Sequence, residues 1–282
     1  MKIIGGPASQ LLASRVAKTL DCDLALCEYK TFPDNEMYVR ILDDVGQDAV
    51  IIQSTATDSD FMALLQLIDA CSSAEKVHVV IPYMGYARQD KQFKPGESLS
   101  ARAVARAILA DNVITVNIHE HSVLDHFNCN TIDIDAAPHV GKYLNELNLN
   151  SPVVLGPDKG AIHMAESAAV ELGADYDHLQ KKRLSGDIVQ MAPKNLDVRD
   201  RDVVILDDMV ATGGTVAEAV GMLRAQGASR VYVACIHPVL AGSALIKLYH
   251  SGIVDVIATD TLEKAVSKVS VAPLIAQTLK RL

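Results

Sequence analysis

The chain has 282 residues, 49% of them hydrophobic, and its 26 Lys and Arg against 35 Asp and Glu leave a formal net charge of −9. At about 100–200 residues per domain this length favours two domains, and the dispersed 16 Gly and 10 Pro exclude a collagen-like or low-complexity chain. The acidic balance argues against a broad basic surface for nucleic acid or anionic lipid, so any phosphate binding has to be local.

Short runs rich in Val and Ile alternate along the chain with segments that carry apolar residues at helical spacing. In the first half, strands are predicted from Lys2, Tyr38, Ala49, Val77 and Val113, and helices near 8–20, 58–74 and 98–110. In the second half, strands are predicted from Pro152, Val203, Val231 and Val254, and helices near 159–173 and 214–227. This alternation, with nearly continuous apolar strands, predicts an α/β fold in which helices cover both faces of doubly wound parallel sheets.

The alternation breaks near residues 144–153, where Asn, Ser and Pro cluster between two similar strand–helix series. We therefore predict two domains, 1–147 and 148–282. A second polar segment, residues 181–202, has three cations at its start, a central Gly and little helical period. A loop of this length in a compact domain is usually functional or mobile, so we expect a functional loop here.

The segment "VVILDDMVATGGT", residues 203–215, ends an apolar strand on polar residues just before a predicted helix. Ligands of open parallel sheets bind beyond the carboxyl ends of the strands. Gly213 and Gly214 let the backbone approach a phosphate closely, Thr212 and Thr215 add hydroxyl donors, and the helix start offers free N–H groups. The pattern predicts a site for one phosphate monoester. It matches neither a P-loop nor a Gly-x-Gly-x-x-Gly dinucleotide motif.

Two adjacent carboxylates, Asp207 and Asp208, precede this loop. Side chains alternate in direction along a strand, so the two cannot both grip one bare ion if the strand continues through them. We predict instead that one or both accept hydrogen bonds from sugar hydroxyls.

The string resembles the phosphoribosyl-pyrophosphate loop of type I phosphoribosyltransferase-like proteins. Further stretches are similar, in the same order and over nearly the whole chain, to ribose-phosphate pyrophosphokinases. They are "FPDNEMYVRI" from Phe32, "IIQSTA" from Ile51, "VIPYMGYARQDKQFKPGESLSAR" from Val80, "VNIHEH" from Val116, "GPDKG" from Gly156 and "IHPVLAG" from Ile236. The resemblance implies two Rossmann-like domains of phosphoribosyltransferase type, the first serving ATP and the second ribose 5-phosphate, with the last helix, 272–282, packing back on the first domain.

The implied reaction moves the β,γ-diphosphoryl group of ATP to the anomeric hydroxyl of ribose 5-phosphate. By this resemblance the ATP site comprises Phe32, Asp34, Asn35, Glu36, Arg88 and Gln89. The first four lie in a segment that a neighbouring subunit would contribute, which implies a homo-oligomer, at least a dimer. A guanidinium at position 88 suits paired hydrogen bonds to phosphate oxygens.

The resemblance also implies a Mg²⁺ ion held by His119 and Asp158. A carboxylate is a natural ligand of this hard cation, whereas an imidazole nitrogen is less usual. Direct ligation by His119 and an indirect role, through water or by orienting phosphate, remain equally open.

Lys181 and Arg183, at the start of the polar segment, match the family's catalytic cations, although Lys182 leaves the register uncertain by one. The ribose 5-phosphate residues are Asp207, Asp208, Ala211, Thr212, Gly213, Gly214 and Thr215. Ala211 departs from the pattern, because many bacterial members carry an acid there. Its backbone N–H can still bind phosphate, but a contact that the acid would make to the sugar is lost.

Two other functions stay open: a phosphoribosyltransferase, which would consume the activated sugar, and a regulatory relative that binds nucleotide without turnover. "FPDNE" and "GYARQD" disfavour the first, and retention of the proposed metal and catalytic residues disfavours the second. Five widely spaced cysteines without a Cys-x-x-Cys pair, and no run of 18 apolar residues, predict a reduced cytoplasmic protein.

Overall fold

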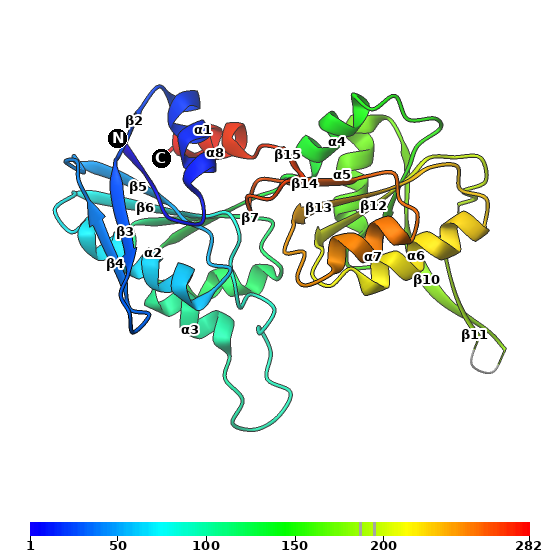
Figure 1. The fold of residues 1–282 in the computed structure, drawn as a ribbon, viewed down its shortest axis with the longest axis horizontal. Helices are drawn as coiled ribbons and strands as arrows, with labels where there is room; N and C mark the ends of the chain where they lie inside the picture. Colours follow the sequence, from blue (N-terminus) through cyan, green and yellow to red (C-terminus); the bar gives the residue numbers. More distant parts are fainter. Residues whose placement is uncertain (186–187, 194–195) are drawn as a thin grey trace. The chain divides into compact units, whose positions relative to one another are not determined.

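The computed structural model of the chain describes residues 1–185, 188–193 and 196–282, and for residues 181–185 and 188–192 it describes the backbone alone (Figure 1). By internal contacts the chain forms two compact units. The first comprises Met1–Asp135 with Thr261–Glu263 and Ser270–Leu282. The second comprises Ala136–Asp260 with Lys264–Val269.

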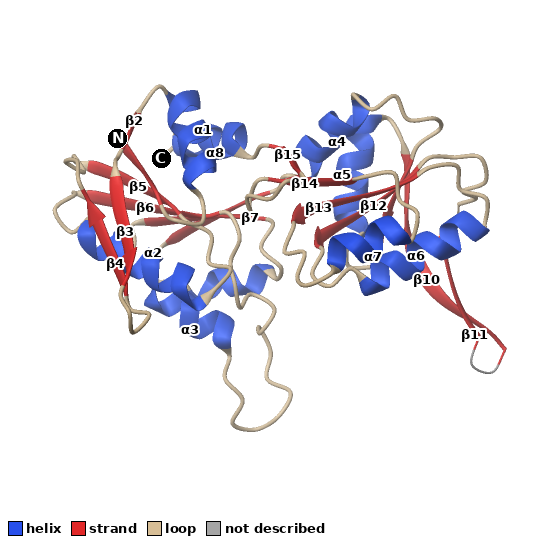
Figure 2. Cartoon of the chain, in the orientation of Figure 1, coloured by secondary structure: helices blue, strands red, loops and turns tan. Residues whose placement is uncertain are grey.

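The first unit is built on a sheet of six parallel strands in the order β2-β1-β5-β6-β7-β8. The strands are β1 (Lys2–Gly5), β2 (Asp23–Leu24), β5 (Asp48–Ile52), β6 (Lys76–Ile81), β7 (Asn112–Val116) and β8 (Asn130–Ile134). The helices are α1 (Gln10–Leu20), α2 (Asp58–Ala70), α3 (Ser100–Ala107), α8 (Ala272–Leu279) and the 3-10 helix η1 (His121–His126). Figures 1 and 2 show α1 and α8 on one face of the sheet and α2 and α3 on the other.

The central strands of this sheet are apolar at successive positions. Residues 50–52, 79–81 and 113–114 are all completely buried. Consecutive strand residues point to opposite faces, so complete burial of all of them requires helices on both sides.

The second unit has a seven-stranded sheet in the order β11-β10-β9-β12-β13-β14-β15, parallel except for the antiparallel β10–β11 pair. The strands are β9 (Val153–Gly156), β10 (Asp175–Ser185), β11 (Ile188–Pro193), β12 (Val203–Met209), β13 (Val231–His237), β14 (Val256–Thr259) and β15 (Ser267–Val269). The helices are α4 (Ala137–Asn145), α5 (Ile162–Leu172), α6 (Gly214–Ala225) and α7 (Ala244–His250). Helices α4 and α5 cover one face and α6 and α7 the other (Figure 2). The predicted fold class, two parallel-sheet α/β units, is confirmed.

The units divide ahead of the polar segment at which we placed the boundary. Helix α4 packs against α5 and therefore belongs with the second unit, which begins at Ala136. At the other end of the chain, α8 packs against α1 within the first unit.

Two predictions need correction: the strand from Tyr38 is confirmed as a strand but not as part of the parallel sheet, and residues 181–202 were wrongly predicted as a loop. The strand predicted from Tyr38 does not join the parallel sheet: it is β4 (Met37–Ile41), which pairs antiparallel with β3 (Cys27–Thr31) in a separate two-stranded sheet. Residues 181–202 are not a single loop, because β10 and β11 form an antiparallel ribbon that pairs Lys181 with Met191. Such a ribbon is held by backbone hydrogen bonds and needs no apolar periodicity, so composition did not reveal it.

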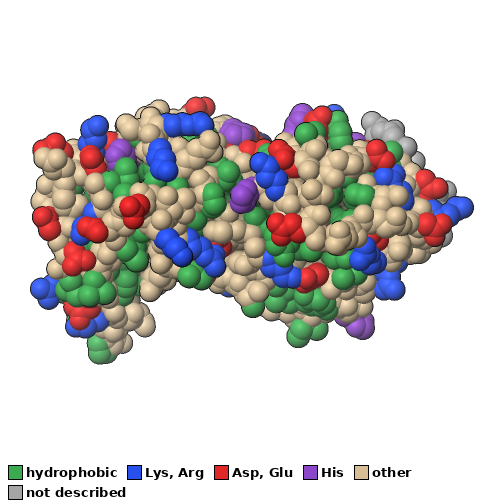
Figure 3. Space-filling view, turned by 90° about the horizontal axis from the view of Figure 1, so that it is seen from above, with side chains coloured by type: hydrophobic (Ala, Val, Ile, Leu, Met, Phe, Trp, Pro, Cys, Tyr) green, Lys and Arg blue, Asp and Glu red, His purple; other side chains and the backbone are tan. Residues whose placement is uncertain are grey.

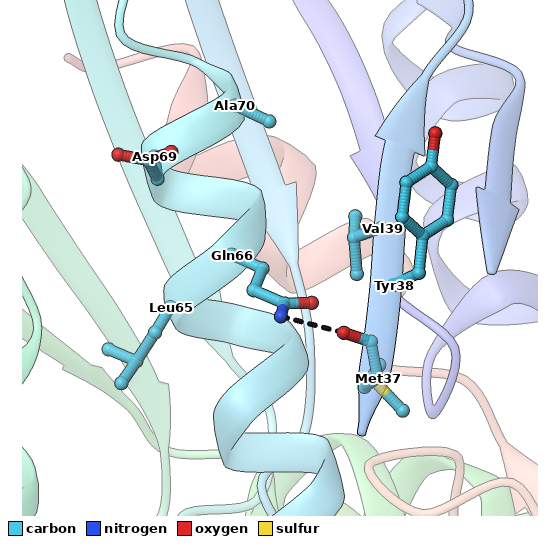
Figure 4. Close-up of a pocket in the computed structure, with 7 residues that line it drawn as sticks. All are labelled: Met37, Tyr38, Val39, Leu65, Gln66, Asp69 and Ala70. Atoms are coloured by element: carbon cyan, nitrogen blue, oxygen red, sulfur yellow. Dashed lines mark hydrogen bonds between the residues drawn. The ribbon is translucent and has the colours of Figure 1, made fainter. Parts of the chain in front are cut away.

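The β3–β4 hairpin is anchored to the first unit through α2. The Gln66 side-chain amide donates a hydrogen bond to the Met37 carbonyl at 2.8 Å (Figure 4). Helix and strand line a pocket of about 410 Å³ with Met37, Tyr38, Val39, Leu65, Gln66, Asp69 and Ala70. The hairpin therefore has a fixed base, from which its turn, residues 32–36, projects.

Acidic and basic side chains are interspersed on the face of the molecule that Figure 3 presents. Among the described residues, no helix combines the length and the apolar character needed to cross a membrane.

Candidate active site

The glycine-rich loop after β12 has the backbone geometry of an anion site. Gly213 precedes α6 with φ of 71°, and a Cβ there would come within 3.3 Å of both the Ala244 carbonyl oxygen and the Leu248 side chain. Gly214 meets nothing within 4 Å of its virtual Cβ, and α6 has no side-chain N-cap. The first amides of α6 thus keep the hydrogen-bonding capacity and positive potential that a phosphate needs.

Asp207 and Asp208 end β12 at this loop. The Asp207 carboxylate accepts a hydrogen bond from the Asp208 amide at 2.9 Å, and the Asp208 carboxylate accepts one from the Met209 amide at 2.6 Å. Burial, the largest cause, and the charges of Asp208 and Asp158 together raise the pKa of Asp207 to about 7. An acid held this way gains from hydroxyl or cationic partners that favour its ionised form.

Asp158 follows β9, the neighbour of β12 in the sheet, at the same carboxyl edge. Its Oδ1 accepts hydrogen bonds from the Gly160 and Ala161 amides at 2.7 and 3.3 Å, which fixes the turn into α5. The side chain is exposed. Its electrostatic effect on Asp207 shows that the acids of the two strands share one edge of the second unit.

A divalent metal fits this edge only with help from other ligands. Among the described residues, no group of three or more His, Cys, Asp or Glu side chains could hold a metal ion. Mg²⁺ commonly binds through one or two carboxylates, water and substrate phosphates, and the exposed Asp158 carboxylate fits that role.

In the first unit, the loop after β6 is locked onto the segment after β5. The Thr55 amide donates to the Tyr83 carbonyl at 2.8 Å, and the Gly85 amide donates to the Thr55 hydroxyl at 3.0 Å. A Cβ at Gly85 would lie 2.0 Å from the Thr55 carbonyl oxygen, so only glycine fits this contact. The loop continues through Tyr86, with φ of 63°, towards the proposed ATP residues.

Arg88 and Gln89 lie exposed within this loop, which continues to α3. The Gln89 side chain accepts a hydrogen bond from the Ser100 hydroxyl at 2.7 Å, and its carbonyl accepts one from the Ala101 amide at 3.2 Å. These bonds tie the loop to the start of α3. A rigid base of this kind suits residues that orient a ligand.

His119 is exposed in the loop after β7, next to β6 in the sheet, so it shares the carboxyl edge with Arg88 and Gln89. Lys91, which follows the β6 loop, contacts Glu120 with its ammonium group at 3.5 Å. Sequence reasoning selected site residues from both loops but did not predict the ion pair between Lys91 and Glu120, because a Lys and a Glu 29 positions apart carry no local signal.

Phe32, Asp34, Asn35 and Glu36 form the turn of the β3–β4 hairpin, and all four are exposed. Asn35 has φ of 70°, and the Phe32 amide donates to the Glu36 carbonyl at 2.8 Å. The turn belongs to the separate two-stranded sheet and not to the six-stranded sheet whose carboxyl edge carries Arg88.

Lys181 and Arg183 lie on β10, where their backbones pair with Met191 and Val189. Their side chains lie outside the described part of the chain. Positions 181 and 183 share one face of the ribbon and position 182 the other, because strand residues alternate.

Two family models match the chain. The model described as the N-terminal domain of ribose phosphate pyrophosphokinase matches residues 1–110, and the model described as the phosphoribosyl transferase domain matches residues 133–266.

Whole-length relatives carry the same description. The ribose-phosphate pyrophosphokinase of Methanosarcina acetivorans is 60% identical, with 100% of both chains covered. That of Methanosarcina mazei is 58% identical over 99% of this chain and 95% of its own. A crystal structure of phosphoribosylpyrophosphate synthetase from Mycobacterium smegmatis superposes with a TM-score of 0.84 at 30% identity, over 99% of this chain and 97% of that one.

Proposed function

We infer the reaction from the family to which this chain belongs, that of the ribose-phosphate pyrophosphokinases. The chain transfers the diphosphoryl group of ATP to the anomeric hydroxyl of ribose 5-phosphate, giving 5-phosphoribosyl 1-pyrophosphate and AMP. The observation that carries the assignment to particular residues is the loop at 211–215, where an uncapped helix start follows two acids.

Ribose 5-phosphate binds in the second unit. Its phosphate accepts hydrogen bonds from the amides and hydroxyls of Ala211, Thr212, Gly213, Gly214 and Thr215. Its ring hydroxyls donate to Asp207 and Asp208, which stabilises their ionised forms against the burial that opposes ionisation. Ala211 contributes its backbone amide alone.

ATP binds at the carboxyl edge of the first unit. Arg88 pairs with phosphate oxygens and Gln89 contacts the base, both from the loop locked by Thr55. Phe32, Asp34, Asn35 and Glu36 come from the hairpin of a neighbouring subunit, where the exposed ring stacks on adenine and the polar groups bind its amino group. The enzyme is thus a homo-oligomer, at least a dimer.

Asp158 and His119 are the residues that would hold Mg²⁺ with the phosphates of ATP, and the ion would supply neutralisation of charge on the transferring group. His119 serves either as a ligand or through water. Lys181 and Arg183 stabilise the charge that develops between the attacking and leaving oxygens. In this role they close over the transferring group during the reaction and open to release product.

AMP release from magnesium ATP, measured with and without ribose 5-phosphate, tests the function. Sugar-dependent AMP is the expected result. Tight ATP binding without turnover would select a regulatory protein, and release of pyrophosphate from phosphoribosyl pyrophosphate on addition of a nucleobase would select a phosphoribosyltransferase.

Complementation between subunits tests the shared ATP site. We expect Phe32→Ala and Arg88→Ala each to raise the KM for ATP at least about tenfold, a loss of roughly 1.4 kcal/mol. Mixing the two variants after dissociation of the oligomer should restore sites of wild-type KM, because a hybrid pairs an intact hairpin with an intact loop. The same variants left unmixed are the control. If the mixture shows only the mutant KM, Phe32 and Arg88 of the same subunit serve the same ATP site.

A further inference from the structure

Asp133, on β8, is a buried carboxylate that holds the neighbouring strand and the loop beyond it. Its side chain is 8% exposed. Oδ1 accepts a hydrogen bond from the Thr115 hydroxyl at 2.6 Å, and the Ile118 amide donates to Oδ1 at 3.1 Å and to Oδ2 at 3.3 Å. The His121 imidazole lies 3.8 Å from Oδ2. One carboxylate therefore contacts Ile118, directly before His119, and His121, two positions after it.

The loop that these contacts hold has an unusual backbone. Asn117 lies in the left-handed region with φ of 39°, where a non-glycine residue needs support. Its amide donates to the Ile134 carbonyl at 2.9 Å, and its side chain donates to Asp135 at 2.9 Å. Residues 133–135, at the end of β8, thus fix both the turn out of β7 and the peptide that follows it.

Burying an ionised carboxylate to hold a loop costs free energy. Burial raises the pKa of Asp133 above its ordinary value, while the Thr115 hydroxyl, the Ile118 amide and His121 lower it in part and Asp135 adds to the rise. The ionised form is therefore less stable here than in water. The bonds from Thr115 and Ile118 offset part of that cost, so the carboxylate and the loop stabilise one another.

We propose that Asp133 is a positioning residue for His119: it holds the loop from Asn117 to Glu120 in the conformation that presents His119 to metal-bound ATP. The inference rests on the proposed function. Asp133 touches no substrate and acts through the Ile118 amide, one peptide before His119.

The test compares three variants of the full-length enzyme. Asp133→Ala removes the acceptor, whereas Asp133→Asn keeps the Oδ1 acceptor that both the Thr115 hydroxyl and the Ile118 amide contact. Asp111→Ala is the matched control, because Asp111 accepts a bond from the Val77 amide at 2.7 Å in the same unit but ahead of β7, at the opposite edge of the sheet.

Three quantities are measured: hydrogen exchange of the 117–120 amides without ligand, the Kd of magnesium ATP by calorimetry without sugar, and the KM of each substrate. We expect Asp133→Ala to speed exchange in this loop and to raise the Kd and KM for magnesium ATP at least about tenfold, the loss typical of residues that orient metal ligands. The KM for ribose 5-phosphate should stay within about twofold, because that sugar binds in the other unit. Asp133→Asn should recover most of the loss, and Asp111→Ala should lower stability without changing the Kd.

An unchanged Kd for magnesium ATP in folded Asp133→Ala would overturn the proposal, as would equal losses for both substrates. If Asp133→Ala does not fold, Thr115→Val removes one of the bonds without a change of shape, and a wild-type Kd there would overturn it equally. Sugar-dependent AMP from the wild type tests the proposed function separately, since the Kd comparison needs no turnover.

Discussion

Replacing Lys181 by alanine is expected to lower kcat at least about tenfold, roughly 1.4 kcal/mol of barrier, with little change in the Kd of magnesium ATP. A cation that meets the transferring group only near the transition state contributes to kcat and not to ground-state binding. Steady-state AMP formation at saturating substrates, with ATP binding measured separately by calorimetry, checks both halves of the expectation.

Lys182→Ala is the matched control for this substitution. The ribbon pairs Lys182 with Gln190 and Lys181 with Met191, so positions 181 and 183 share a face that position 182 does not. Lys182→Ala should therefore keep kcat within about twofold of the wild type. A loss confined to Lys182→Ala would shift the catalytic register by one residue, and full activity of both variants would remove the ribbon from the mechanism.

The sequence predicted well those elements whose local signals are strong. The run from Val203 to Leu206 is apolar at every position because β12 lies between two layers of helices. Gly213 and Gly214 follow where the backbone needs a positive φ and open space. The match of pattern to structure at this loop is close because strand end, glycines and helix start are all local features.

Features that depend on contacts between distant segments were not predictable in this way. The strand β4 has the composition of a parallel strand. Only its pairing with β3 and its hydrogen bond from Gln66 distinguish it from a strand of the main sheet. Asp133 lies in "TIDID", where nothing local tells which of the two acids turns inward.

Asp207→Asn is expected to stabilise the ligand-free protein and to weaken its binding of ribose 5-phosphate. The folded-state pKa of Asp207 is raised to about 7 by burial and by the charges of Asp208 and Asp158. Between the unfolded value, about 3.9, and 7 the native state holds the proton more tightly, so wild-type stability falls as pH rises through this window. The full loss remains above pH 7. Asparagine is neutral at every pH and does not suffer this loss of stability. The variant should therefore melt several degrees higher than the wild type at pH 8, at roughly 2–4 °C per kcal/mol, and the difference in melting temperature should vanish towards pH 4.

The expected cost of this substitution is functional. A carboxylate accepts stronger hydrogen bonds from ribose hydroxyls than an amide does, so the KM for ribose 5-phosphate should rise at least about tenfold. Asp202→Asn is a control for which the expected change in stability has the opposite sign. Burial opposes ionisation of Asp202, but the hydrogen bonds and charge of Arg230 hold its pKa below the ordinary value. That variant should lose stability at pH 8 and keep its KM. The measurements are calorimetric melting at pH 4–8 and initial rates. A wild-type KM in Asp207→Asn would remove this acid from the sugar site. A wild-type melting curve of Asp207→Asn at pH 8 would mean that ionisation of Asp207 does not destabilise the native fold.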